Sequence, residues 1–420
     1  MQIFQTELPF TQADIQELAH LIPCPVRDVC FFDIETTGLS PKISNVYLIG
    51  AARLVFDRFI LTQWFADDYN SEFSLLNAFS EYLEDCRLVT HYNGSTFDIP
   101  YLEKKYIDYG LSSPFSFRSH TQLHSYNNDQ FEPSDSDTTD APDSMLSISL
   151  ENLDIYRRVA SCKNRFPVEN NKLITMERYL GFNRGTDISG KECIRLYTDY
   201  MQKKYAHLDS EKHSLQKTIL KHNSDDLIGT IRCAKLLYFT DYRPGSPIIS
   251  TTDKSVIITD KLSDGLRFPV KLAYDNPITK SKTPIGKKPL PDSKPKGEFK
   301  TLNPVVHIEF DKDTLTVQVP LLRDTLYHYF YDYKDYYYLP DEDMAIHKSV
   351  GSFVDRHHRE QANAANCYSR KDGLFLPLPS CIYPDRIPVF YRKGWTRSAA
   401  FIESDSISGI NVKEYLKGYI

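Results

Sequence analysis

The first half of the chain shows a hydrophobic pattern that alternates between strand-like and helix-like segments. Residues 29–34, 46–55 and 59–65 are runs of aliphatic and aromatic side chains, and only a short turn at Asp57 and Arg58 separates the last two runs. Runs of this length and composition are typical of strands. Three of them in succession predict a meander of neighbouring strands.

Helical spacing follows these strands. Apolar side chains recur three and four positions apart in residues 75–83, 98–109, 173–180 and 212–238, whereas residues 88–91 form a further short apolar run. These patterns predict four helices and one more strand. Because strands and helices that alternate along a chain form a sheet with helices packed on it, we expect an α/β fold with a mixed sheet flanked by helices.

Two polar segments interrupt this pattern. Residues 127–144 carry six acidic side chains and no basic one, and such a segment buries too little apolar area to offset its chain entropy, so we expect an exposed insertion. In residues 280–300, seven lysines and four prolines are typical of an extended tether. We therefore expect a first domain over residues 28–240, a Lys/Pro-rich linker over residues 241–300 and a smaller α+β region over residues 301–420.

The last region is rich in tyrosine. Its first residues, 305–310 and 314–319, predict a β-hairpin, and seven tyrosines fall within the twelve residues from Tyr327 to Tyr338. Two interpretations are open. The rings alternate on a strand or wedge against the first domain as packing, or they form an accessory surface on which the bases of a single strand stack, with the upstream lysines along its phosphates. The sequence assigns no role to this Tyr-rich accessory domain.

Composition narrows the class of protein. The length of 420 residues agrees with two or more domains, and the 41% hydrophobic and 25% charged residues disfavour a disordered chain, a collagen-like fibre and a coiled coil. A formal net charge of −6 removes the argument for a globally basic surface, so a polyanionic partner would need a local patch or a metal ion.

The sequence contains no recognisable membrane span, signal peptide or cysteine motif. No apolar run approaches the roughly 20 residues of a membrane span, and no signal-peptide pattern opens the chain, so we expect a cytoplasmic protein without a membrane partner. The eight cysteines include no CxxC pair, which argues against a zinc ribbon or a disulfide scaffold.

Two carboxylates lie at the end of the first predicted strand. Asp33 and Glu35 are two residues apart, so both side chains leave the same face of the sheet. Such a pair in an apolar strand is costly unless a cation neutralises it, and oxygen ligands suit Mg²⁺ or Mn²⁺. A solvent-facing acidic pair on an edge strand explains the doublet equally well.

The segments that follow the doublet favour a metal-binding site over a solvent-facing acidic pair. Directly after the doublet comes a turn formed by Thr36, Thr37, Gly38 and Leu39. The glycine allows backbone N–H groups of this turn to approach a phosphate or a nucleotide end. A third acid, Asp98, opens a predicted helix after a turn at Asn93. Taken alone, Asp98 is better explained as a helix N-cap.

The helix predicted over residues 212–238 supplies a histidine and a fourth acid. His222 and Asp226 lie one turn apart on the stripe that includes Ile219, whereas Asp225 lies on a polar stripe. We therefore expect Asp226, and not Asp225, to point inward. A lone histidine there is usually a hydrogen-bonded core residue, but a histidine and an acid together need a partner such as a metal ion.

The segments DIETTGL, HYNGSTFDIPYL and HNSDDL, in this order, resemble the three exonuclease motifs of the DEDD (DnaQ-like) superfamily, which has a ribonuclease H-like fold. The segments LDIYRR and KLITMERYLGFNRGTDISGKECIRLYTDYM also resemble the linking segments of the YprB-type ribonuclease H-like branch. The resemblance spans residues 28–238, about half of the chain. It implies a ribonuclease H-like domain there and says nothing about the C-terminal region.

Carried over motif by motif, the resemblance implies four metal-binding carboxylates and one water-activating residue, which are Asp33, Glu35, Asp98 and Asp226, and His222. Thr36, Gly38, Leu39 and Asn93 would seat the terminal nucleotide. The histidine branch of the family places its histidine five residues before the last acid, and the tyrosine branch places its tyrosine four before. This chain departs from both, because His222 stands four residues before Asp226.

The implied reaction is hydrolysis of a phosphodiester. Two ions, Mg²⁺ or Mn²⁺, would be held by the carboxylates, and neutral His222 would accept the proton of the attacking water. We thus expect a metal-dependent 3′→5′ exonuclease that acts on single-stranded DNA or RNA ends and releases nucleoside 5′-monophosphates. The alternatives are a catalytically silent nucleic-acid-binding or scaffold protein of the same fold and an endonuclease with the same metal chemistry. The sequence identifies no protein partner.

Overall fold

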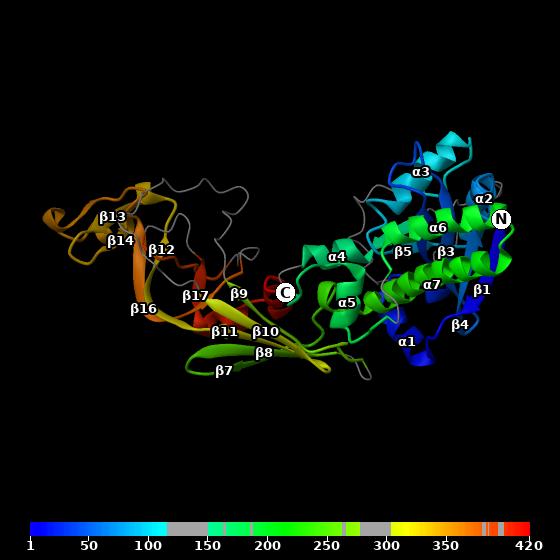
Figure 1. The fold of residues 1–420 in the computed structure, drawn as a ribbon. Helices are drawn as coiled ribbons and strands as arrows, with labels where there is room; N and C mark the ends of the chain where they lie inside the picture. The colour runs from blue at the N-terminus through cyan, green and yellow to red at the C-terminus, as the bar shows by residue number, and fades with distance from the viewer. Residues whose placement is uncertain are drawn as a thin grey trace, which may run out of the picture. The chain divides into compact units, whose positions relative to one another are not determined.

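The computed structural model describes residues 1–115, 150–162, 165–184, 188–262, 266–277, 304–379, 384, 386–393 and 399–420. The chain divides into two compact units, Met1–Asp241 and Tyr242–Ile420 (Figure 1). The acidic insertion expected over residues 127–144 and the Lys-rich segment expected over residues 280–300 lie outside the described residues.

A six-stranded sheet organises the first unit, with the strand order β1-β4-β3-β2-β5-β6. The strands are β1 (Gln2–Glu7), β2 (Val29–Thr36), β3 (Val46–Val55), β4 (Arg58–Phe65), β5 (Leu88–His91) and β6 (Glu151–Asp154). Pairs among β1 to β4 are antiparallel, whereas β5 runs parallel to both β2 and β6. The sheet is therefore mixed, and both the α/β class and the meander of β2, β3 and β4 are confirmed.

Helices cover this sheet. They are α1 (Gln12–Leu21), α2 (Glu72–Leu83), α3 (Asp98–Asp108), α4 (Ile155–Ser161), α5 (Leu173–Tyr179), α6 (Gly190–Tyr205), α7 (Asp209–Cys233) and α8 (Leu237–Thr240). The long helices α6 and α7 lie side by side and both contact β2 (Figure 1). Phe31 and Phe32 leave β2 on opposite faces and are 0% and 1% exposed, which explains why β2 is a continuous apolar run. None of the helices in the described part of the chain is both long and apolar enough to span a membrane.

The first unit begins earlier than the domain boundary expected at residue 28. Strand β1 pairs along its whole length with β4, from Gln2 opposite Phe65 to Glu7 opposite Ile60. Most side chains of β1 are exposed, as expected for an edge strand. This strand completes the sheet on the side of the meander.

The prediction of a linker over residues 241–300 is wrong for residues 248–277, which contain three strands. Strands β7 (Ile248–Thr251), β8 (Ser255–Lys261) and β9 (Leu272–Pro277) join β10 (Val305–Asp311) and β11 (Thr314–Pro320) in a five-stranded sheet. Val256 and Ile258 of β8 are fully buried, so these short strands contribute to a core. The Lys/Pro composition of residues 280–300 does not extend upstream to them. The hairpin of β10 and β11 is confirmed, with Lys312 at a φ of +55° in its turn.

The rest of the second unit holds the tyrosine cluster. Two three-stranded sheets form from β12 (Leu322–Tyr329), β13 (Tyr336–Leu339), β14 (Met344–His347), β15 (Glu360–Gln361), β16 (Tyr368–Pro377) and β17 (Phe401–Glu403). Two short helices, α9 (Lys348–Gly351) and α10 (Val412–Lys417), accompany these strands, so the expected α+β class is confirmed. Phe330 stacks on Tyr336 with ring centroids 4.7 Å apart, and the Tyr338 hydroxyl donates to Asp343 at 2.7 Å. Tyr336 and Tyr338 therefore pack within their own unit, whereas Tyr331 is exposed.

Candidate metal centre

The acidic doublet lies in the middle of the sheet. Strand β2 pairs with β3 on one side and β5 on the other, so Asp33 and Glu35 do not lie on an edge strand. Burial raises the pKa of both carboxyls well above the ordinary range, and the nearby carboxylates of Asp226 and Asp98 raise it further. The alternative of a solvent-facing acidic pair is wrong.

Asp98 reaches the same strand from the first turn of α3. The N-cap of this helix is Phe97, so Asp98 is its first helical residue. Its Oδ1 accepts a hydrogen bond from the backbone N–H of Ile34, in β2, at 3.2 Å. Burial raises the pKa of Asp98 to about 7, and the carboxylates of Asp154 and Asp226 contribute to this rise. Asp98 thus lies near the other carboxylates, but the carboxylates whose oxygens lie within 4.8 Å of one another are Asp33, Glu35 and Asp226.

Helix α7 brings the histidine and the last acid to these carboxylates. The Nε2 atom of His222 lies 3.4 Å from Glu35 Oε1 and 3.3 Å from Asp226 Oδ2. Carboxylate oxygens of Asp33, Glu35 and Asp226 lie within 4.8 Å of one another. Asp225 instead pairs with Lys221, one turn away, at 2.9 Å. Of the two adjacent acids, Asp226 is therefore the one that lies beside Glu35 and His222.

The residues of this cluster fit a hard divalent cation. Carboxylate oxygens are the ligands that Mg²⁺ and Mn²⁺ prefer. Buried carboxylates that repel one another become ionised at neutral pH only when a cation compensates their charge. Burial and the repulsion of nearby carboxylates raise the pKa of Asp33, Glu35 and Asp98, and a bound cation would offset both effects.

An amide network that sequence reasoning missed holds Asp33. The side chain of Asn223 is fully buried on α7, and its Nδ2 donates to Asp33 Oδ2 at 2.8 Å. Its Oδ1 accepts from Gln63 Nε2 of β4, also at 2.8 Å. Gly50 of β3 makes room, because a Cβ there would overlap Asn223 Oδ1 and lie 2.8 Å from Leu227 Cδ1. A glycine within a strand is a signal of such a close approach.

An arginine pairs with the last acid. The guanidinium of Arg184 binds Asp226 Oδ1, and its Nε donates to Glu177 Oε2 at 2.6 Å. Glu177 lies on α5 and is 2% exposed, and a Cβ on Gly229 would overlap its carboxylate. Arg184 therefore fixes one oxygen of Asp226, while the other oxygen faces His222.

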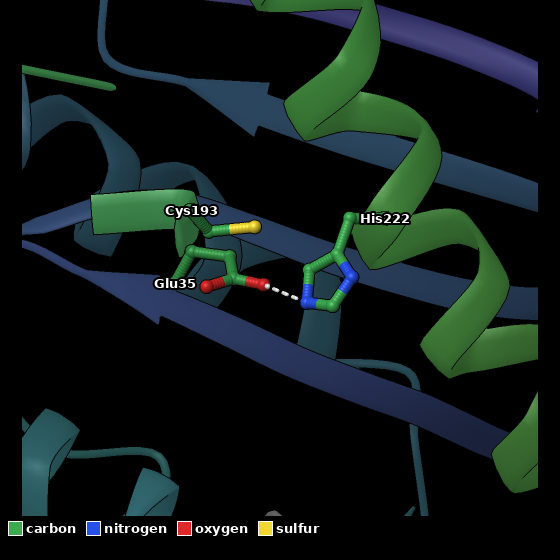
Figure 2. Close-up of side chains that lie close together, drawn as sticks. All are labelled: Glu35, Cys193 and His222. Carbon is green, nitrogen blue, oxygen red and sulfur yellow. Dashed lines mark ion pairs between the residues drawn. The ribbon is translucent and has the colours of Figure 1, made fainter. Parts of the chain in front are cut away.

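A cysteine also borders the cluster. Cys193, in the first turns of α6, is fully buried, and its Sγ lies within 4.8 Å of both a Glu35 oxygen and a His222 nitrogen. Figure 2 shows these three side chains converging from different elements. The spacing of cysteines along the chain gave no signal of this contact, because only the fold brings α6 next to β2 and α7.

The residues expected to seat a nucleotide border the two motifs. The Thr36 hydroxyl donates to the Gly38 carbonyl at 2.9 Å, and Leu39 is 82% exposed. Asn93 adopts a φ of +68°, and its N–H donates to Asp154 Oδ1 at 2.9 Å. The Thr36 and Leu39 turn follows β2 directly, whereas Asn93 lies in the turn between β5 and α3. Both turns thus adjoin elements that carry the carboxylates.

The chain resembles a known protein family, a curated protein and a solved structure. Residues 30–238 match the family described as the RNase_H superfamily. The uncharacterized protein YprB of Bacillus subtilis (strain 168) is 36% identical over 81 residues, which are 19% of this chain and 19% of that protein, so the match spans about a fifth of this curated relative. The family B DNA polymerase from Pyrobaculum calidifontis matches with a TM-score of 0.34 and 12% identity, over 74% of this chain and 35% of the polymerase.

Proposed function

Because residues 30–238 belong to the RNase_H superfamily, we propose that this chain is a metal-dependent 3′→5′ exonuclease acting on single-stranded nucleic-acid ends. Membership in this superfamily confirms the ribonuclease H-like fold expected from the three motifs. The observation that carries the proposal is the convergence of Asp33, Glu35 and Asp226 within 4.8 Å, from two elements that are far apart in the sequence. We assign the activity to the unit Met1–Asp241 and an accessory role to the second unit.

The carboxylates would hold the metal. Asp33, Glu35, Asp98 and Asp226 are the residues that would bind Mg²⁺ or Mn²⁺, as two ions. In such a site divalent cations turn water into a nucleophile and stabilise the charge on the departing oxygen of a phosphodiester. His222 Nε2, which lies 3.3 to 3.4 Å from two of these carboxylates, would accept a proton from the attacking water.

Neighbouring side chains keep the ligands in place. Asn223 donates to one oxygen of Asp33, and Arg184 binds one oxygen of Asp226, so each carboxylate presents its remaining lone pairs in a fixed direction. The turns at Thr36 to Leu39 and at Asn93 would receive the terminal nucleotide, whose base would contact the exposed Leu39 side chain.

The alternative function is catalytically silent binding of nucleic acid. One observation favours it: Arg184 already supplies a positive charge to Asp226, which stabilises this carboxylate without a metal ion. The two functions differ in Mn²⁺ uptake. Calorimetry follows a titration of the chain with Mn²⁺. A nuclease should bind Mn²⁺ saturably, and this binding should weaken in a variant of Asp98. A silent protein should show no Mn²⁺ binding that depends on Asp98.

The activity is tested on 5′-labelled single strands of DNA and RNA in Mg²⁺ or Mn²⁺. We expect stepwise shortening from the 3′ end, with nucleoside 5′-monophosphates as products and no cleavage in a chelator. A strand whose 3′ end is blocked, and a circular single strand, are the controls that separate an exonuclease from an endonuclease. Asp33→Asn keeps the shape of the side chain and should abolish the products. Absence of products from the wild-type chain on all substrates would overturn the proposal.

A further inference from the structure

Three potential ligands of different chemistry converge beside the carboxylate cluster. Glu35 comes from β2, Cys193 from α6 and His222 from α7, and Figure 2 shows their side chains pointing toward one another. One ligand atom of each lies within 4.8 Å of the other two. His222 Nε2 and Glu35 Oε1 are 3.4 Å apart.

This set of donor atoms differs from that of the carboxylates alone. A sulfur, an imidazole nitrogen and a carboxylate oxygen are ligands of Zn²⁺ and similar borderline cations, whereas Mg²⁺ does not bind sulfur in proteins. Zinc bonds of about 2.0 to 2.3 Å in a tetrahedron place neighbouring ligand atoms about 3.3 to 3.8 Å apart. The pair of His222 and Glu35 has this separation already, so a small shift of the Cys193 side chain completes the arrangement.

A further carboxylate borders this set. Asp226 Oδ2 is 3.3 Å from His222 Nε2, but Asp226 converges with Asp33 and Glu35 and not with Cys193, so the fourth position is left to water. The side chains of Glu35 and His222 are each 9% exposed and Cys193 is fully buried, whereas Asp226 is 20% exposed. An ion would therefore enter past Asp226 and reach the sulfur last.

We propose that Glu35, Cys193 and His222 form a thiolate-containing site for Zn²⁺ or a related borderline divalent cation, overlapping the Mg²⁺ or Mn²⁺ centre. On binding, the Cys193 thiol releases its proton to solvent and its sulfur bonds to the ion. The same ion occupies Glu35 and the Nε2 atom of His222, so it blocks both the hard-metal centre and the proton acceptor. This inhibitory effect rests on the proposed nuclease function, but the binding does not.

Cobalt tests the binding by itself. Co²⁺ occupies zinc sites and absorbs in the near ultraviolet when it is bound to a thiolate. We expect this absorption when the full chain is titrated with Co²⁺, and its loss when Zn²⁺ is added. In Cys193→Ala the thiolate band should be absent and the dissociation constant for Co²⁺ should rise at least about tenfold. Cys30→Ala, which removes another fully buried thiol from β2, should keep the band.

Circular dichroism and thermal melting establish that each variant folds. If Cys193→Ala is unfolded, His222→Gln provides the second variant and should weaken Co²⁺ binding while the sulfur is intact. No thiolate band in the wild-type chain, or a band that survives in Cys193→Ala, would overturn the proposal. Inhibition is measured separately, as the Zn²⁺ concentration that halves each variant's own Mn²⁺-dependent nuclease activity, and this should rise at least about tenfold in Cys193→Ala. A thiolate band without any nuclease activity would contradict the nuclease and leave the zinc site standing.

Discussion

Among single residues, Asp98 carries a clear pH dependence. Burial raises its pKa to about 7 from 3.8, so the folded metal-free protein holds a proton at this side chain that the unfolded chain has released. The corresponding stability is fully present below pH 3.8 and is lost as the pH rises through 7. A bound cation removes this loss, because it favours the ionised carboxylate.

We expect Asp98→Asn to remove this dependence. In a chelator, the free energy of unfolding of the wild type should fall between pH 5 and pH 8 by about 3 kcal/mol more than that of Asp98→Asn. Urea denaturation at the two pH values measures the difference. Asp225→Asn, which removes a carboxylate that pairs with Lys221, is the control and should follow the wild type. Equal pH profiles for wild type and Asp98→Asn would contradict the raised pKa of the buried Asp98.

Gly50 tests the amide network around Asp33. A Cβ at this position would overlap Asn223 Oδ1 and crowd Leu227, so we expect Gly50→Ala to destabilise the protein by about 1 to 3 kcal/mol and to weaken Mn²⁺ binding. Gly190→Ala is the matched control, because nothing lies within 4 Å of a Cβ there. Urea denaturation and Mn²⁺ titration of both variants give the comparison. A Gly50→Ala protein as stable as Gly190→Ala would show that the network tolerates displacement.

The sequence predicted the acids of the site better than their supports. Asp33, Glu35 and Asp226 stand out because carboxylates interrupt apolar patterns. Asn223 and Cys193 do not, since an amide beside a histidine looks like a polar helix position, and a cysteine looks like an ordinary core residue. Their contacts depend on which helix faces which strand, and the spacing within one helix does not contain that information.

At the level of elements, α7 connects the site to α5. The long helix presents Asp226 to β2, and the buried Glu177 of α5 holds Arg184 against this acid. Removing one partner of a buried ion pair leaves the other charge uncompensated, which costs more than the pair contributes. The Arg184 contact therefore matters for stability as well as for the orientation of Asp226.

We expect Arg184→Met to lower the free energy of unfolding by about 3 to 5 kcal/mol. The double variant with Glu177→Gln should recover part of this loss, because it removes the charge left behind. Arg195→Met provides the control: Arg195 pairs with Glu192 and Asp199 on the exposed face of α6, where such pairs contribute less than about 1 kcal/mol. Urea denaturation measures the free energy of unfolding of the three variants. A loss in Arg184→Met no larger than the loss in Arg195→Met would contradict a stabilising role for the buried ion pair.

Element boundaries followed from the sequence where the pattern is strong. Strands β3 and β5 begin and end where the apolar runs do, because both are buried on each face. Strand β1 and helix α1 went unrecognised, since an exposed edge strand has little periodicity to detect. The strands β7 to β9 were missed for a similar reason: they are short, and the polar segment that follows them masks their alternation.

At the scale of the whole molecule, the two compact units separate the candidate centre from the tyrosine cluster. All the residues of the centre lie within Met1–Asp241. We therefore expect a chain that ends at Asp241 to unfold cooperatively and to melt at a higher temperature in Mn²⁺ than in a chelator. Thermal denaturation of this fragment, with the fragment Tyr242–Ile420 as the metal-insensitive control, measures both. A fragment that does not fold, or that is indifferent to Mn²⁺, would contradict the division.

The nuclease activities of variants at two adjacent residues, Asp225 and Asp226, most directly test whether the carboxylate cluster is a nuclease centre. Asp226 faces Glu35 and His222, whereas Asp225, one residue earlier on the same helix, pairs with Lys221. Release of nucleoside 5′-monophosphates from a single strand in Mn²⁺ is measured for the wild type, Asp225→Asn and Asp226→Asn. We predict release by the wild type and by Asp225→Asn, and at least about a hundredfold slower release by Asp226→Asn. No release by the wild type, or equal rates for the two variants, would contradict a nuclease built on this carboxylate cluster.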